Sequence, residues 1–144
     1  MFYDFERDFI RKLDAWDPVN VTKANIQFFS LGFGDTEPES VRVVTGFEYG
    51  TPGGSDRASL GDNYLERTEG TAVVSLFAGK TLSRQIFLEL FKELKFYLAG
   101  NATINLPDVD VTYRSADLEG GYTENQEGVM SIRMLYLIDR KVVT

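Results

Sequence analysis

The triplet Gly79-Lys80-Thr81 has the residue types of a phosphate-binding loop and lies between an apolar stretch and an amphipathic one. Such a loop has the pattern Gly-x-x-x-x-Gly-Lys-Ser/Thr, because several backbone N–H groups must curl around the phosphates before the helix begins. The first glycine of that pattern is missing, because its position holds Val74, and residues 73–77 have the character of an extended strand. The sequence therefore predicts an ordinary turn from strand to helix, with Thr81 or Ser83 as the N-cap. The triplet leaves a small nucleotide-binding enzyme as an alternative.

Carboxylate pairs are the other residues whose spacing suggests chemistry. They are Asp108 with Asp110, Asp117 with Glu119, and Glu124 with Glu127. Asp108 and Asp110 would share one side of a strand, which is how a metal pair could be held. Their spacing matches no calcium loop, because the closing glutamate of such a loop is missing. We expect a solvated strand face here, with no catalytic residue, no metal and no cofactor.

The sequence contains neither cysteine nor histidine. Disulfide scaffolds, zinc sites built on these residues, thiol nucleophiles and histidine-based triads are therefore excluded. The chemistry that remains would use carboxylate, lysine, tyrosine or serine groups, or a hard metal ion held by oxygen atoms. None of these residues forms a recognisable active-site pattern, so we expect a protein that is not an enzyme.

The composition is that of one globular domain. Hydrophobic residues make up 43% and charged residues 26% of the 144 residues, and we place a single domain over 1–144. The net charge of −7 disfavours tight binding of DNA or RNA, because such binding requires Lys and Arg to neutralise phosphates. No apolar run approaches the ~20 residues of a membrane helix, and the start of the chain lacks the pattern of a signal peptide. We therefore expect synthesis in the cytoplasm.

Apolar periodicity predicts helices over 3–16 and 82–98. It predicts strands over 24–30, 41–49, 64–77, 108–113 and 129–138, with polar loops at 31–40 and 115–128. The run 129–138 is almost continuously apolar, which is typical of a central strand covered on both faces. The order of elements indicates an α+β fold, with a mostly antiparallel sheet of about five strands and two helices packed on one face.

Residues 50–63 are rich in glycine and serine and offer almost no apolar side chain for packing. A long loop without regular structure is unusual inside a compact domain and is often functional or disordered. Two interpretations remain open: an arm that becomes ordered when it binds a partner, and a hairpin tip without such a role.

The order of elements and several local patterns resemble the tail terminator proteins of long-tailed bacteriophages, the family of the lambda minor tail protein U. The resemblance involves the first helix, the glycine-rich hairpin, the second helix and the closing strands. It also involves Glu37-Pro38-Glu39-Ser40-Val41-Arg42-Val43, a loop leading into an edge strand, and Glu66-Arg67-Thr68-Glu69-Gly70-Thr71-Ala72-Val73-Val74, where an arginine and a glycine precede a strand. It implies a homo-oligomeric ring, commonly a hexamer, in the virion. That ring ends the tail tube, meets the head connector and lets DNA pass without specific binding.

The resemblance implies assembly surfaces and no catalytic residues. We expect assembly contacts at the glycine-rich hairpin 50–63, on the second helix and in the segment 118–128, with candidate residues Gly50, Pro52, Arg57, Leu60, Phe96, Leu118 and Tyr122. A ring that conducts DNA also favours an acidic lumen, to which Asp108, Asp110 and Glu119 are assigned. A head–tail adaptor of the same particle is the alternative of the same class.

Overall fold

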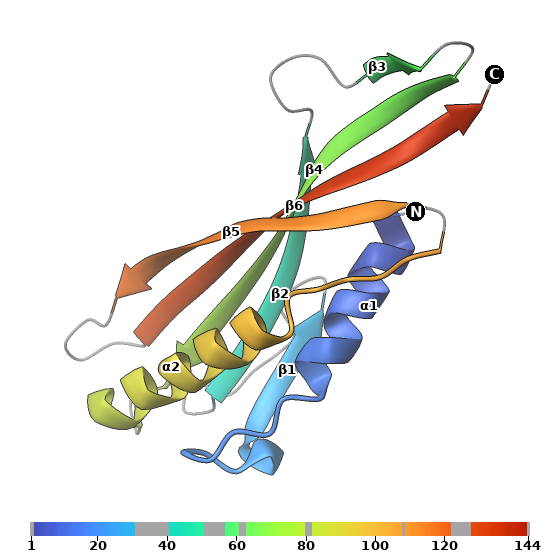
Figure 1. The fold of residues 1–144 in the computed structure, drawn as a ribbon. Coiled ribbons are helices and arrows are strands. Elements are labelled where there is room, and N and C mark those ends of the chain that lie inside the picture. Colours follow the sequence, from blue (N-terminus) through green and yellow to red (C-terminus); the bar gives the residue numbers. More distant parts are fainter. Residues whose placement is uncertain are drawn as a thin grey trace.

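The computed structural model describes residues 2–30, 41–50, 57–60, 63–79, 82–107, 109–121 and 128–143 (Figure 1). The elements in chain order are α1 (Phe2–Asp14), a short 3-10 turn (Lys23–Asn25), β1 (Ile26–Ser30), β2 (Val41–Gly50), β3 (Arg57–Leu60), β4 (Asn63–Ala78), α2 (Arg84–Gly100), β5 (Asp110–Gly121) and β6 (Gly128–Val143). This order confirms the two predicted helices and the five predicted strands, most with ends shifted by one or two residues. β5 runs to Gly121 instead of 113 and β6 to Val143 instead of 138, and β3 was not predicted.

The sheet has the strand order β1-β2-β4-β6-β5, and the short β3 pairs with β4 outside this path. β1 pairs with β2 in parallel, and the other pairs are antiparallel. The predicted α+β class with a mostly antiparallel sheet of about five strands is therefore confirmed.

Two loops expected from the sequence are partly wrong. Residues 57–60, inside the stretch 50–63, form β3, because the backbone of 63–66 offers them hydrogen-bonding partners. Residues 115–121 continue β5 rather than forming a loop, because β6 extends far enough to pair with all of them. Polar side chains are tolerated there because β5 is the last strand of the sheet and its residues 114–120 are exposed.

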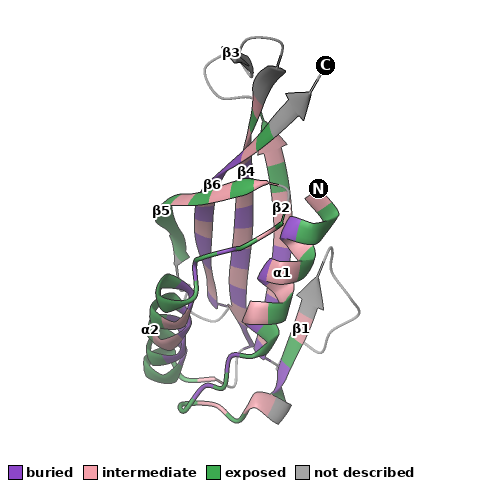
Figure 2. Ribbon diagram, turned by 45° about the vertical axis from the view of Figure 1, so that its right-hand side comes forward, coloured by how far each residue is buried: buried purple, intermediate pink, exposed green. Residues whose placement is uncertain are grey.

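One face of the sheet, here called the core face, is buried. Helix α1 packs because Phe5, Phe9 and Leu13 recur three or four residues apart, and each is at most 4% exposed. Alternate residues of the strands complete this core, among them Val43, Val74, Leu76, Ile132, Met134 and Tyr136. In Figure 2 the buried residues of β4 and β6 recur along each strand, as the period of two requires.

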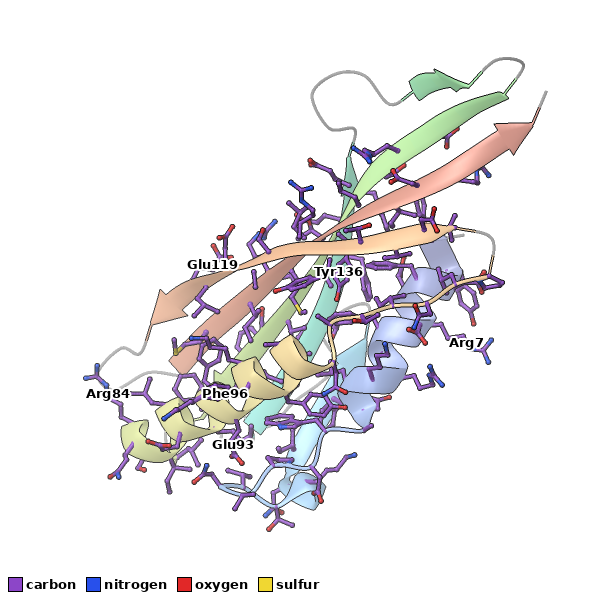
Figure 3. All side chains as sticks on the ribbon, in the orientation of Figure 1. Arg7, Arg84, Glu93, Phe96, Glu119 and Tyr136 are labelled. Carbon is purple, nitrogen blue, oxygen red and sulfur yellow. The ribbon has the colours of Figure 1, made fainter. Side chains whose placement is uncertain are left out.

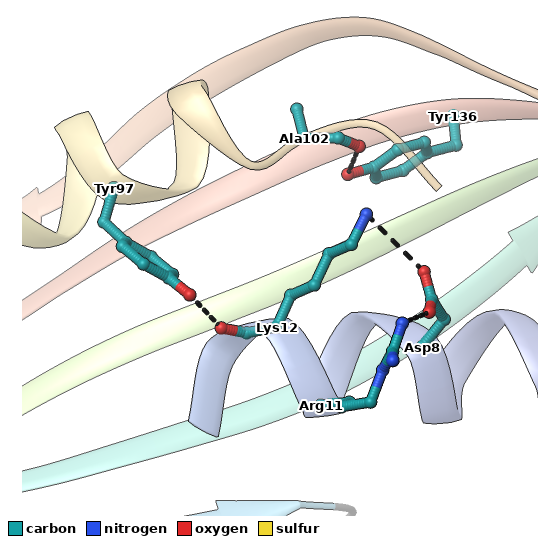
Figure 4. A network of polar contacts seen from close by, with 6 residues as sticks. All are labelled: Asp8, Arg11, Lys12, Tyr97, Ala102 and Tyr136. Carbon is teal, nitrogen blue, oxygen red and sulfur yellow. Dashed lines mark hydrogen bonds and ion pairs between the residues drawn. The ribbon is translucent and has the colours of Figure 1, made fainter. Parts of the chain in front are cut away.

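Tyr136 of β6 joins both helical regions to this core. Its ring packs edge-on against Phe5 and Phe9 of α1, with centroid separations of 5.1 and 6.4 Å. Its hydroxyl donates a hydrogen bond of 2.8 Å to the carbonyl oxygen of Ala102, just after α2 (Figure 4). Tyr97 of α2 donates a hydrogen bond to the carbonyl oxygen of Lys12 in α1. Burial is the main cause that raises the pKa of both tyrosines.

The other face, here called the open face, remains partly or fully exposed along most of its length. β6 lies between β4 and β5, as expected of an interior strand, but the predicted coverage of both its faces is only partly confirmed: on the open face Ser131 and Leu137 are buried. Arg133 and Leu135 point to the open face and are partly exposed. The nearly continuous apolar run therefore reflects a core face that is mostly buried and an open face that is buried at only some positions.

The strands β4 and β6 extend together beyond the rest of the sheet. Their pairing begins with Asn63 opposite Val143 and ends with Ala78 opposite Gly128. β2, by contrast, pairs only with residues 69–77 of β4. Figure 1 shows β3 and the paired ends of β4 and β6 projecting past α1. Residues 57–60, 63–68 and 140–143 are called the arm below. Arg67 of the arm forms two hydrogen bonds of 2.7 and 3.0 Å with Asp139.

Candidate functional site

The strand that precedes Gly79 leaves no room for a phosphate cradle. β4 continues to Ala78, so residues 73–77 are extended, and Val74 is fully buried in the core. Ser83 is the N-cap of α2, and its hydroxyl oxygen accepts a hydrogen bond of 3.2 Å from the N–H of Ile86. The sequence had offered Thr81 or Ser83 for this role. Lys80 and Thr81 lie outside the described residues.

The open face is the broadest candidate surface. Its rows follow from the strand registers, since directly paired residues share a face. Five rows that cross the sheet from β2 to β5 carry charge. Three lie at its middle: Glu48–Thr71–Leu135–Ser115, Gly46–Val73–Arg133–Asp117 and Val44–Ser75–Ser131–Glu119. The rows on either side of them contain Glu69 and Arg42. A further row, Arg67–Asp139–Asp110, lies toward the arm. Acidic residues outnumber basic ones on this face.

A β-bulge brings the acids of β5 onto this one face. Tyr113 pairs with Tyr136 and Ser115 pairs with Leu135, so Arg114 is an extra residue without its own partner in β6. Strict alternation would place Asp110 on the opposite face from Asp117 and Glu119. Because the bulge absorbs Arg114, all three point to the open face. Figure 3 shows Glu119 pointing away from α2.

Arg133 organises the charges at the middle of the open face. One guanidinium nitrogen lies 2.6 Å from a carboxylate oxygen of Glu48 on β2, and another lies 3.8 Å from Glu119 on β5. These side chains remain 35%, 61% and 57% exposed, respectively, so solvent screens the pairs and each contributes little stability. Their arrangement still fixes where negative charge is displayed.

A shallow hollow of about 290 Å³ adjoins this network on β2 and β4. Val44, Gly46, Glu48 and Val73 are among the residues that line it. Gly46 contributes to the hollow because it has no side chain, and nothing lies within 4 Å of where its Cβ would be. The hollow has no deep or enclosed part that would hold a small molecule away from water.

Two of the predicted lumen residues share a face of the sheet but are not brought close together. Asp110 and Glu119 lie on the same face of β5, near its two ends, and both are exposed. Asp108 lies outside the described residues. Sequence reasoning did not assign Asp117 and Arg133 to this surface. The spacing of Asp117 and Glu119 by two residues was a usable signal for one shared face.

The predicted assembly residues lie in several places. Gly50 is the last residue of β2 and pairs with Glu69, and Phe96 on α2 is 65% exposed. Leu118 is 46% exposed and points to the core face of β5, beside α2. Arg57 and Leu60 are the end residues of β3, and their side chains lie outside the described part of the structure. Pro52 and Tyr122 also lie outside it.

One exposed loop is held by α2. The carboxylate of Glu93 accepts hydrogen bonds from the backbone N–H groups of Val19 and Asn20, at 2.7 and 3.1 Å. Val19 is thereby presented with 90% of its surface exposed. Burial would raise the pKa of the Glu93 carboxyl, but these hydrogen bonds and that of the Asn20 side chain outweigh it, so the pKa is lowered. The sequence gave no signal for this contact, whose partners are 74 residues apart.

Among the described residues, no cluster of three or more Asp or Glu side chains is placed to hold a metal ion. No helix within the described part of the chain has the length and apolar character needed to cross a membrane. Comparison of the sequence with protein-family models and with curated proteins gave no match.

Proposed function

We propose that the protein is a structural component of a long-tailed phage particle, a tail terminator rather than an enzyme. Its copies form a ring on the end of the tail tube, stop tube polymerisation and provide the joining surface for the head connector. It acts in the virion after assembly in the host cytoplasm. The observation that carries this proposal is the broad, acidic open face.

An acidic face suits the wall of a channel through which DNA moves. Tight DNA binding depends on Lys and Arg neutralising phosphates, so a wall with excess carboxylate repels the polyanion and does not retain it. Asp110, Asp117 and Glu119 supply this charge along β5, and Glu48 extends it to β2. Arg133 is held between Glu48 and Glu119, which reduces its availability to phosphate.

The arm suits contact along the axis of such a ring. It projects past α1 and so could reach a neighbouring ring (Figure 1). In the arm, β4 and β6 are held together by backbone pairing. Two ion pairs between these strands, Arg67 with Asp139 and Arg140 with Glu66, add to it. A closed ring also needs two different complementary patches on each subunit, because its contacts are heterologous.

The test is the growth of tail tubes from purified tube protein with and without this protein. We expect rings on tube ends and a sharp limit on tube length by electron microscopy. Tubes of unchanged length without end rings would exclude a terminator. Rings that bind isolated connectors but not tubes would indicate the head–tail adaptor instead.

A charge-reversal pair tests the role of the open face. We expect Asp117→Lys with Glu119→Lys to leave particles assembled but to slow the triggered release of DNA. Asp17→Lys with Glu89→Lys is the matched control, because it makes the same change in net charge at exposed positions away from the open face. Equal release from both variants would show that the open face does not line the channel.

A further inference from the structure

We propose that the outer edge of β5 and the groove beside it form a binding site for an extended peptide segment of alternating apolar and basic residues. β5 ends the strand path of the sheet, and among the described strands it pairs only with β6. The backbone groups on its other side therefore offer hydrogen bonds to an added strand. This proposal does not depend on the terminator function.

The groove lies between α2 and the core face of β5 and β6 and has a volume of about 340 Å³. Its apolar lining comes from Leu98 and Ala99 of α2 and from Ala116, Leu118, Ile132 and Met134 of the sheet. Leu118 is 46% exposed, an unusual state for a leucine on the core face of a strand. A partner that covers Leu118 would remove this apolar surface from water.

A strand added to the edge of β5 would project alternate side chains to the two faces of the sheet. Those on the core face would lie beside Ala116 and Leu118. Ala116 and Leu118 line the groove and are both exposed, so apolar side chains of the peptide can contact it there. An amphipathic helix would cover Leu118 but would leave the backbone groups of the edge without strand pairing.

The side chains on the other face of the added strand would meet carboxylates. Asp117 and Glu119 point to the open face of β5, and Asp110 lies on the same face toward the other end of the strand. Opposite charges on neighbouring strands stabilise pairing, and like charges destabilise it. Lysine or arginine at alternate positions of the peptide therefore complements this edge.

The same charges argue against pairing between two copies of β5. Such a pair would bring carboxylates of one copy toward those of the other, and like charges on neighbouring strands destabilise pairing. The edge thus disfavours self-association and favours a basic strand. This selectivity is the reason that we assign it to a peptide of that pattern.

The probe is the peptide acetyl-Lys-Val-Lys-Val-Lys-Val-Lys-amide, titrated into the full-length 15N-labelled protein at low salt. We expect amide resonances of residues 115–119 to shift and their hydrogen exchange to slow, with weaker binding as salt rises. Two control peptides define the pattern: one with Glu in place of Lys, and one with the same composition arranged as a valine block and a lysine block. Equal binding by either control, or shifts confined to other elements, would overturn the proposal.

Variants of the protein test the two halves of the site. Leu118→Ser should weaken binding of the alternating peptide by about tenfold, because it removes apolar contact from the groove. Ile86→Ser is the matched control, since Ile86 is 40% exposed on α2 and lies outside the groove lining.

Asp117→Lys with Glu119→Lys should abolish binding of the lysine peptide and permit binding of the glutamate peptide. Unchanged preference after this charge reversal would contradict the proposed edge pairing.

Discussion

At the scale of single residues, Tyr136 shows how one side chain connects distant parts of this protein. Its ring fills the space between α1 and the sheet, and its hydroxyl satisfies a carbonyl group just after α2. Burial is the main cause that raises its pKa, and the negative charge of Asp8 contributes to the same direction. The neutral hydroxyl is therefore part of the folded state.

We predict that Tyr136→Phe lowers the free energy of unfolding by about 1–2 kcal/mol, because the Ala102 carbonyl oxygen loses its buried partner. The effect should also depend on pH. The folded-state pKa is raised above the unfolded value of 10.0, so this stabilisation is complete below pH 10 and is lost as the pH rises further. Urea denaturation from neutral to alkaline pH measures both effects.

In the same titration, Tyr136→Phe should lose less stability at alkaline pH than the unmodified protein. Tyr3→Phe is the control, because Tyr3 is 72% exposed. A Tyr136→Phe variant as stable as the control, with the same alkaline loss, would show that the hydroxyl bond contributes nothing.

At the scale of elements, the bulge in β5 decides which residues form each surface. Arg114 has no partner of its own in β6, because Tyr113 and Ser115 pair with consecutive residues of that strand. The extra residue changes the alternation, so that even-numbered residues before it and odd-numbered residues after it point to the same face. The core face thus receives Tyr113, Ala116 and Leu118, and the open face receives Asp110, Asp117 and Glu119.

We predict that deletion of Arg114 is tolerated, with a change in unfolding free energy of only about 1 kcal/mol. The deletion removes the extra residue, so the remaining residues of β5 keep both their partners in β6 and their faces. Deletion of Ser75 is the contrasting control. Ser75 pairs with both Val44 and Ser131, so its loss shifts the register and sends later residues of β4 to the wrong face.

Circular dichroism and thermal unfolding distinguish these outcomes. The Arg114 deletion should retain a cooperative transition, and the Ser75 deletion should not fold. If the Arg114 deletion also fails to fold, the bulge itself is required for packing against α2.

At the scale of the whole molecule, charge is expected to govern assembly. The net charge of −7 per chain makes stacked rings of the proposed terminator repel one another unless a complementary partner lies between them. Charges on exposed surfaces are screened over about 10 Å at 0.1 M salt. Repulsion should therefore weaken as salt is added.

We predict monomers or single closed rings at low salt and at most short stacks at high salt. Sedimentation velocity across a salt series measures this distribution, with electron microscopy to identify the species. Long tubes formed by the pure protein at low salt would indicate a tube subunit rather than its terminator.

The sequence by itself determined the elements whose signals are local. The spacing of Phe5, Phe9 and Leu13 specified the buried stripe of α1, and the alternation from Val41 to Tyr49 specified the buried side of β2. Val74 argues against a phosphate cradle from the sequence alone, because a valine occupies the position of the glycine that the cradle requires. Such signals succeed because each depends on neighbours within one element.

Only the tertiary structure decided how the strands combine. β1 could not be assigned its parallel partner, and β3 could not be recognised, because their hydrogen-bonding partners come from other parts of the chain. The bulge at Arg114 follows from pairing with β6, and no local pattern in β5 reveals it. The two candidate surfaces depend on this tertiary arrangement. The strand registers bring Glu48, Arg133 and Glu119 into one network, and the packing of α2 on the core face sets that helix beside Leu118.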